Sequence, residues 1–251
     1  MFCDIYSSLS GSASLGWTCE SPPSCSEPPS SVTCDGDGNV IRLELYNVGL
    51  SGTIPSSIGF LVNLESLVLF ENSLSGSIPS SIGLLTSLSL LIVGSNKLTG
   101  PIPSSVGYLT ALETLFLGNN KLTEAIPSSI GFLVNLESLV LHGNSLTRSI
   151  PSSFGFLEYL GSLELYENSL SGSIPSSIGQ LTSLTALYLH YNSFSGVIIS
   201  SIGFLSILKH ILLTSNRLSG VIPSSIAGLQ SLEELCLMHN KLTGQPSNCN
   251  C

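Results

Sequence analysis

Residues 35–39 are of the types that bind calcium, because they read Asp-Gly-Asp-Gly-Asn. A complete loop of this kind needs glycine at its sixth position and glutamate at its twelfth. Here those positions hold Val40 and Tyr46. The ligand set is therefore incomplete, and we interpret the segment as a turn that precedes the first regular strand.

The cysteines suggest a different chemistry, since thiolates bind zinc or form disulfides. None of them lies between Cys34 and Cys236. Such an arrangement favours disulfides that close the two ends of the chain, and these form in an oxidising compartment. A metal site at Cys236, His239 and the last two cysteines is the weaker alternative, so we predict no metal and no cofactor. The disulfide candidates are Cys3, Cys19, Cys25, Cys34, Cys236, Cys249 and Cys251.

Serine and histidine also occur together, which raises the question of hydrolytic catalysis. The aspartates, Asp4, Asp35 and Asp37, all precede the repeated region described below, so a Ser-His-Asp triad lacks its acid. A glycosidase pair of carboxylates would need an enclosing cleft. We therefore predict a protein that is not an enzyme.

The composition excludes several other classes of protein. Of 251 residues, 43% are hydrophobic and 9% charged, and the net charge is −9. A nucleic-acid-binding protein would need clustered Lys and Arg, and a disordered chain would be poorer in apolar residues. The apolar runs are also far shorter than the ~18–20 residues that cross a bilayer. These features predict a folded chain without a transmembrane segment.

A period of 24 residues organises the chain into nine copies. In eight of them an asparagine follows the first apolar run, whereas the first, imperfect copy from Val40 has Val48 at that position. One copy is too short to bury its own leucines, so neighbouring copies must stack. An Asn amide can satisfy backbone groups that a tight bend leaves facing inward. We predict this structural role for Asn72, Asn96, Asn120, Asn144, Asn168, Asn192, Asn216 and Asn240.

Within the copy at 64–87, two kinds of element are expected. Residues 67–70 alternate between inward and outward positions, which is typical of a short strand. Pro79 excludes a helix at its own position, and the apolar spacing after it indicates a 3₁₀-like turn. The residues between Asn72 and Ile78 have the spacing of turns. Each strand would extend one parallel sheet.

The pattern Leu-x-x-Leu-x-Leu-x-x-Asn-x-Leu-x-Gly-x-Ile-Pro-x-x-Ile-Gly-x-Leu, as in 64–85, resembles the repeat of plant-type extracellular leucine-rich-repeat proteins. These include receptor-kinase ectodomains and polygalacturonase-inhibiting proteins. The resemblance implies an α/β leucine-rich-repeat solenoid, a curved right-handed superhelix of nine 24-residue repeats. It also implies a parallel β-sheet on the concave face and 3₁₀ or irregular turns on the convex face.

The same resemblance implies the division of the chain. Residues 1–39 would form an N-terminal cysteine-containing cap, 40–246 the repeats, and 247–251 a short C-terminal cap or truncated end. Residues 31–34, Ser-Val-Thr-Cys, resemble the end of the family's N-terminal cap, where two nearby cysteines pair. Cys25 with Cys34 is the pairing this favours.

Residues that alternate with the inward leucines would point outward on the concave face. Two candidate ligand-binding patches follow from their columns. One is an apolar ladder, and the other combines acids, tyrosines and histidines on two adjacent repeats, with His142 in the same column. Exposed apolar surface and tyrosine are both typical of binding sites, although such residues also suit an exposed strand. The candidates are Val68, Phe70, Ile92, Phe116, Val140, His142, Glu164, Tyr166, Glu167, Tyr188, His190 and Tyr191.

The turns carry two further regular features. Bulky apolar residues recur before the last leucine of most copies, as at Phe60 and Phe132, and we expect them to pack on neighbouring repeats; the alternative is a second docking surface. Tandem serines such as Ser80-Ser81 form a hydroxyl array, which we interpret as solvated turns; the alternative is a match to an ice or polysaccharide lattice. Glu124 and Arg148 replace the expected glycine in adjacent copies, where they are placed to pair.

Together these patterns predict non-catalytic recognition of a protein or peptide ligand through the concave face, in receptor-like perception or defence. The alternatives are a secreted inhibitor of a glycan-degrading enzyme and a structural adhesion protein. Partners would be a peptide or protein, with a co-receptor or a secreted hydrolase as further candidates, and no nucleic acid. The cysteines indicate an extracellular or cell-surface location, although the first residues lack the pattern of a signal peptide.

Overall fold

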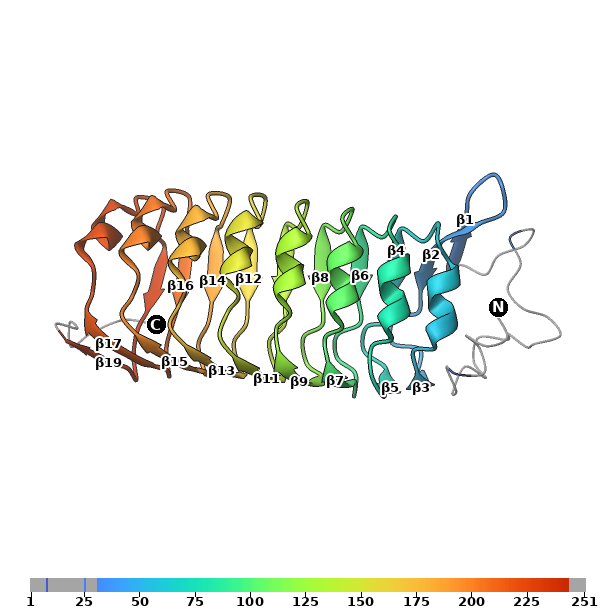
Figure 1. Ribbon diagram of the computed structural model, residues 1–251, viewed down its shortest axis with the longest axis horizontal. Coiled ribbons are helices and arrows are strands. Elements are labelled where there is room, and N and C mark those ends of the chain that lie inside the picture. The colour runs from blue at the N-terminus through green and yellow to red at the C-terminus, as the bar shows by residue number, and fades with distance from the viewer. Residues whose placement is uncertain (1–7, 9–24, 26–30, 244–251) are drawn as a thin grey trace.

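The computed structural model describes residues 31–243, together with Ser8 and Cys25, as one stack of coils (Figure 1). Each coil adds one strand to a ten-stranded sheet, here called the concave sheet, in which nine strands are parallel and β1 pairs antiparallel with β2. Neighbouring parallel strands are offset by one 24-residue repeat, so Leu67 lies opposite Leu91. The predicted nine-copy solenoid is confirmed. Its strands are β1 (Val32–Cys34), β2 (Val40–Glu44), β4 (Ser66–Val68), β6 (Leu90–Ile92), β8 (Thr114–Phe116), β10 (Ser138–Val140), β12 (Ser162–Glu164), β14 (Ala186–Tyr188), β16 (His210–Leu212) and β18 (Glu234–Cys236).

A second row of strands, here called the outer sheet, lies along the lower edge of the coils in Figure 1. The prediction of turns after each Asn is wrong at these positions. Leu74 is buried between Ser73 and Ser75, but an alternation of only three residues is too short to recognise beforehand. The row consists of a two-stranded part and a seven-stranded part, which are not hydrogen-bonded to each other. The strands are β3 (Ser51–Thr53) and β5 (Ser73–Ser75) in the first, and β7 (Thr99–Pro101), β9 (Lys121–Ala125), β11 (Ser145–Arg148), β13 (Ser169–Gly172), β15 (Ser193–Gly196), β17 (Arg217–Val221) and β19 (Lys241–Thr243) in the second.

The predicted 3₁₀ turns form a row of five-residue helices on the side opposite the concave sheet, here called the convex face (Figure 1). Proline precedes most of them, and its fixed φ sets the direction of the chain into the helix. Ile199 replaces this proline in one coil but keeps the same backbone conformation, with φ −65° and ψ 134°. The helices are η2 (Ser56–Phe60), η3 (Ser80–Leu84), η4 (Ser104–Tyr108), η5 (Ser128–Phe132), η6 (Ser152–Phe156), η7 (Ser176–Gln180), η8 (Ser200–Phe204) and η9 (Ser224–Gly228).

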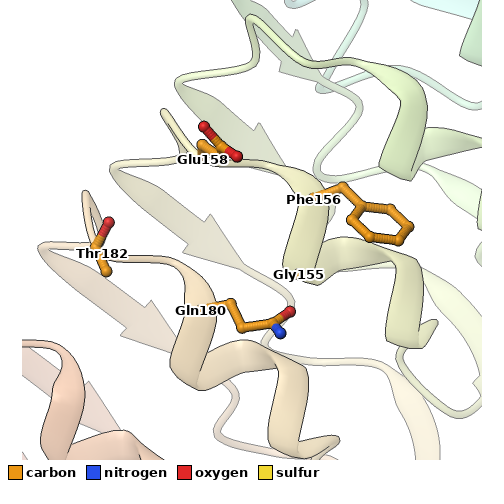
Figure 2. Close-up of a pocket in the computed structure, with 5 residues that line it drawn as sticks. All are labelled: Gly155, Phe156, Glu158, Gln180 and Thr182. Carbon is orange, nitrogen blue, oxygen red and sulfur yellow. The ribbon is translucent and has the colours of Figure 1, made fainter.

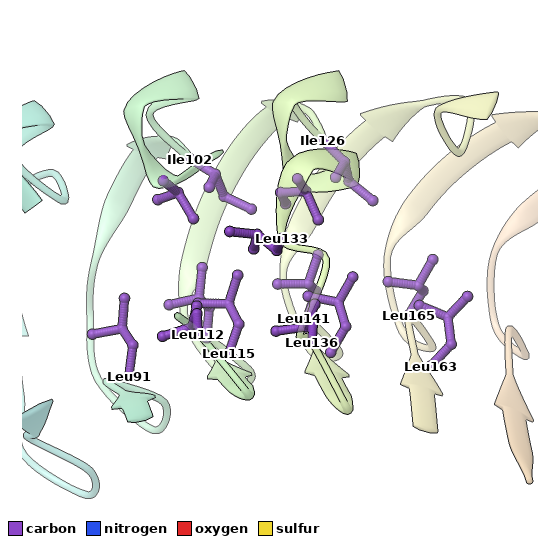
Figure 3. Close-up of a cluster of buried hydrophobic side chains, with 14 of the residues drawn as sticks. Leu91, Ile102, Leu112, Leu115, Ile126, Leu133, Leu136, Leu141, Leu163 and Leu165 are labelled. Carbon is purple, nitrogen blue, oxygen red and sulfur yellow. The ribbon is translucent and has the colours of Figure 1, made fainter. Parts of the chain in front are cut away.

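One continuous core runs along the inside of the stack. Leucines from the concave strands meet isoleucines and leucines from the other sides of each coil, as Figure 3 shows for Leu115, Ile126 and Leu133. Leu115, in the three-residue strand β8, and Leu133, which directly follows η5, are both fully buried. The apolar area that supports the fold is therefore buried between coils.

The asparagine ladder has the structural role predicted for it. The amide of Asn120 accepts a hydrogen bond from the Leu98 N–H at 2.9 Å and donates to the carbonyl oxygens of Val93 and Leu117 at 3.2 and 3.1 Å. The tight bend is set by the preceding residue, which has a positive φ of 53° at Asn119 and 54° at Glu71. Each Asn thus joins its own coil to the coil before it.

The tandem serines form a second ladder between coils. The Ser105 hydroxyl donates to the Ser80 carbonyl at 2.7 Å, and five other coils make the same bond. The second hydroxyl of most pairs thus donates within the protein. These bonds lie on the exposed surface, so the predicted solvated turns also join neighbouring coils.

The ends of the chain lie largely outside the described residues. The structure contains the disulfide between Cys25 and Cys34 that the family resemblance implied, and this prediction is confirmed. Cys3, Cys19, Cys249 and Cys251 lie outside the described residues, so their pairing stays a prediction, as do the proposed caps. No helix among the described residues is long and apolar enough to cross a membrane.

Candidate functional site: the concave face

The predicted binding residues lie on one face because consecutive concave strands keep a 24-residue register. Val68, Ile92 and Phe116 are partly exposed in three adjacent strands. Val140 continues the column but is only 5% exposed, so it does not offer the contact surface expected of it. The apolar ladder therefore ends one repeat earlier than predicted.

A continuous chain of aromatic rings links the two predicted patches into one surface. Phe116 contacts His142 edge-to-face, with ring centroids 5.9 Å apart. His142 stacks on Tyr166 at 4.3 Å, and Tyr166 stacks on His190 at 4.5 Å. The same chain extends toward the N-terminus through Phe70 and Tyr46, and toward the C-terminus through Tyr188, Tyr191 and His210.

Two glycines that sequence reasoning missed make this chain possible. A Cβ atom on Gly94 would overlap the Phe116 ring, and one on Gly118 would lie 3.0 Å from Cε1 of His142. Each ring therefore leans over a glycine of the preceding coil. The signal was available in the sequence, since these two glycines interrupt an otherwise side-chain-bearing column one period apart.

Carboxylates border the rings. Glu164 Oε2 lies 3.6 Å from Nδ1 of His142, which is 8% exposed. Burial raises the pKa of Tyr166 and Tyr188, and the nearby Glu164 carboxylate raises the pKa of both further. A hydrogen bond to Glu71 raises the pKa of Tyr46. The phenols are therefore protonated hydrogen-bond donors at neutral pH.

His190 is expected to make stability depend on pH. Burial lowers the pKa of His190 below its usual 6.5, despite the opposing effect of Glu167. Below pH ~6.5 the unfolded chain then binds more protons than the folded one, so the free energy of unfolding falls as the pH decreases. Thermal midpoints should be measured at about pH 7.5 and at about pH 5.5. The decrease in the midpoint between the two pH values should be smaller for His190→Gln than for the parent protein. Equal losses in both proteins would contradict this role.

The convex face offers a different kind of surface. Its bulky residues are mostly exposed, with Phe132 58% and Phe204 73% accessible, so the prediction that they pack on neighbouring repeats is wrong. Gln180 interrupts this row, and a shallow hollow of about 400 Å³ lies there (Figure 2). Gly155, Phe156, Glu158, Gln180 and Thr182 line the hollow, and none of them belongs to the ring chain.

Charges are divided between the two sheets. Nine of the glutamates lie in or within three residues of concave strands, against two cations, Arg42 and Lys209. Both of these cations face carboxylates, Arg42 at 3.7 Å from Glu44 and Lys209 at 2.8 Å from Glu233. The predicted pair of Glu124 and Arg148 on the outer sheet is absent from the ion pairs of the described region, because no N–O distance between them is within 4.0 Å.

No three ionisable or thiol side chains converge as a metal site within the described part of the chain. The site therefore offers aromatic faces and edges, phenol donors and carboxylates. Groups of this kind can contact a ligand, hydrogen-bond to it and attract opposite charge.

Known family models match most of the repeated region of this chain. Leucine-rich-repeat models match residues 86–146, 134–194 and 182–242, and another model of the same repeat matches 63–85. No curated protein matches the chain.

Solved structures similar to this chain include two plant receptor ectodomains. That of the Arabidopsis thaliana membrane receptor kinase GASSHO1/SCHENGEN3, in complex with CASPARIAN STRIP INTEGRITY FACTOR 2, is 38% identical with a TM-score of 0.80. That of the Arabidopsis receptor kinase HAESA, in complex with an IDA peptide hormone, is 38% identical with a TM-score of 0.78. The match covers 85% of this chain in both cases but only 29% and 36% of those chains.

A plant ice-binding protein is also similar, at 27% identity and a TM-score of 0.74. That match covers 96% of this chain and 85% of the other. The shared architecture thus occurs in proteins that recognise different ligands.

Proposed function

This chain belongs to the leucine-rich-repeat family, in its plant-type extracellular form, and we propose that its concave face binds an extended peptide without catalysing a reaction. The observation that supports this most is the unbroken chain of rings from Tyr46 to Tyr191 across the concave strands. The two receptor ectodomains that resemble this chain were solved in complex with a named factor and with a peptide hormone. Receptor-like perception in an extracellular setting is the role we propose.

The dimensions of the sheet suit such a ligand. Nine parallel strands about 4.8 Å apart span roughly 40 Å. An extended peptide rises about 3.3 Å per residue, so about a dozen residues fit along the face. Glu164 and Glu167 border the central rings, and a basic side chain of the peptide would be attracted to them.

Removing two central rings should weaken binding without unfolding the protein. The probes are random dodecapeptides displayed on phage and selected on the parent chain. Tyr166→Ala combined with Tyr188→Ala is expected to lower the affinity of the selected peptides by about tenfold or more, because tyrosines at the centre of an interface are frequent binding hot spots. Both rings lie on the surface of the sheet, so the thermal midpoint should change little.

The matched control removes two rings from the convex face, through Phe132→Ala combined with Phe156→Ala. These rings are 58% and 62% exposed. The control should keep the parent affinity. A concave double variant that binds as well as the parent, or a selection that yields no specific peptide, would refute the proposal.

The similarity to an ice-binding protein does not lead us to propose ice as the ligand. A lattice match would need a regular row of free hydroxyls, but the second serine of most tandem pairs donates to the preceding coil. On the outer sheet, hydroxyls share their face with Lys97 and Lys121, whose long charged side chains break the regular surface.

A further inference from the structure

The outer sheet has an unusual chemical make-up in two of its columns. Each coil places one inward-pointing Leu or Phe at this sheet, for example Leu74 or Phe194. In all coils from Ser73 to Lys241, the residue before this Leu or Phe is Ser, Lys or Arg. The residue after it is always Ser or Thr, as at Thr99, Thr123 and Thr147. These two positions flank a buried side chain. Where all three residues belong to a strand, as at 121–123, the two flanking residues point to the same outward face, and β7 begins at the second of the two positions, Thr99. Neither column contains an acidic, apolar or aromatic residue.

The cations of this sheet have no carboxylate partner among the described residues. Lys97, Lys121, Arg148, Arg217 and Lys241 are all exposed and lie in or next to its strands. None is within ion-pair distance of an acid, whereas Arg42 and Lys209 on the concave sheet both are. Glu124 is the one acid in these strands. Although the protein is acidic overall, the Lys and Arg side chains that lack a carboxylate partner in the described region all lie on this side.

The spacing of these groups suits a linear polymer. Lys97, Lys121 and Arg148 belong to three consecutive coils. Lys121 lies opposite Thr99, and Thr147, which precedes Arg148, lies opposite Ala125, so the three cations are displaced along the strands and form an oblique line across them. A polymer of uronic acid presents one carboxylate on each sugar ring, together with hydroxyl groups on every ring. Lysine and arginine can pair with the carboxylates, and the Ser and Thr hydroxyls can exchange hydrogen bonds with those of the sugar.

We propose that the outer sheet binds a linear polyuronate, an acidic polysaccharide, along the row from Lys97 to Arg148. This site is separate from the ring chain on the concave sheet. Polyuronate binding at the outer sheet and peptide binding at the ring chain are therefore independent proposals, and the failure of one does not decide the other. Single-stranded nucleic acid fits less well, because its binding relies on aromatic rings on which bases stack, and these columns have none.

The test measures retention of the full chain on immobilised polygalacturonate at low salt, with neutral galactan as the reference polymer. The parent should be retained by polygalacturonate alone, and salt should release it, because counterions compete for the fixed charges. Lys97→Gln combined with Lys121→Gln should reduce the affinity by about tenfold, since charge-assisted hydrogen bonds are the strong contacts of such a site.

The matched control, Arg42→Gln combined with Lys209→Gln, removes the same charge from the concave sheet. It should keep the parent affinity, and circular dichroism should show that both double variants are folded. Three results would overturn the proposal: no retention of the parent, equal weakening by both double variants, or retention on single-stranded DNA as strong as on polygalacturonate.

Discussion

Replacing Gly131 with alanine is expected to destabilise the protein by about 3 kcal/mol, at the upper end of the range for overpacking a tight interior. Gly131 lies in η5, where a Cβ atom would overlap the Ser153 carbonyl oxygen of the next coil. That oxygen belongs to the backbone, so it cannot swing aside as a flexible side chain would. The two coils would have to separate, and the core between them would lose contacts.

Two positions in the chain serve as comparisons for this prediction. Gly161→Ala is the matched control, since its new Cβ would have no neighbour closer than 3.6 Å. In the last coil the position equivalent to Gly131 is Ala227, and no later 3₁₀ helix in the described region packs against it. Chemical denaturation of Gly131→Ala and Gly161→Ala should show a large decrease in the free energy of unfolding for Gly131→Ala only. Similar midpoints would mean that the coils tolerate separation.

Replacing Asn144 with alanine should also cost about 3 kcal/mol, because several buried backbone groups would lose their partner at once. The Asn144 side chain accepts from the Leu122 N–H at 2.9 Å and donates to the carbonyls of Leu117 and Leu141, both at 3.1 Å. Alanine can replace none of these bonds, and water has little access to the interior of the stack.

Asn135→Ala is the control for the asparagine ladder. Asn135 is exposed and donates one hydrogen bond, to the Thr110 carbonyl at 2.9 Å. Its loss should change the midpoint of denaturation only slightly, since surface substitutions have small effects. An Asn144→Ala variant as stable as Asn135→Ala would show that the ladder is not what holds neighbouring coils together.

The repeat made much of the fold predictable. Strict 24-residue spacing fixed the number of coils, the register of the concave strands and the role of the asparagines, because each copy can fold only by stacking on the next. Pro79 and the apolar spacing after it likewise identified the 3₁₀ helices. The outer sheet escaped prediction, since its alternation around Leu74 lasts only three residues.

The candidate site was predicted in parts. The columns placed Phe116, His142 and Tyr166 on one face, but they could not show that the rings stack into one chain. That contact depends on side-chain directions and on the space left by Gly94 and Gly118. The exposure of Phe132 and the burial of Val140 also depend on packing between coils, which a repeat pattern does not specify.

Cross-linking of a bound peptide tests the central claim most directly. Dodecapeptides selected on the parent chain would carry a benzophenone at successive positions, and the attachment sites on the protein would be mapped by mass spectrometry. Binding along the ring chain predicts attachment to concave strands β10 to β16, at or beside Tyr166 and Tyr188. Attachment confined to the 3₁₀ helices or to the outer sheet would contradict it.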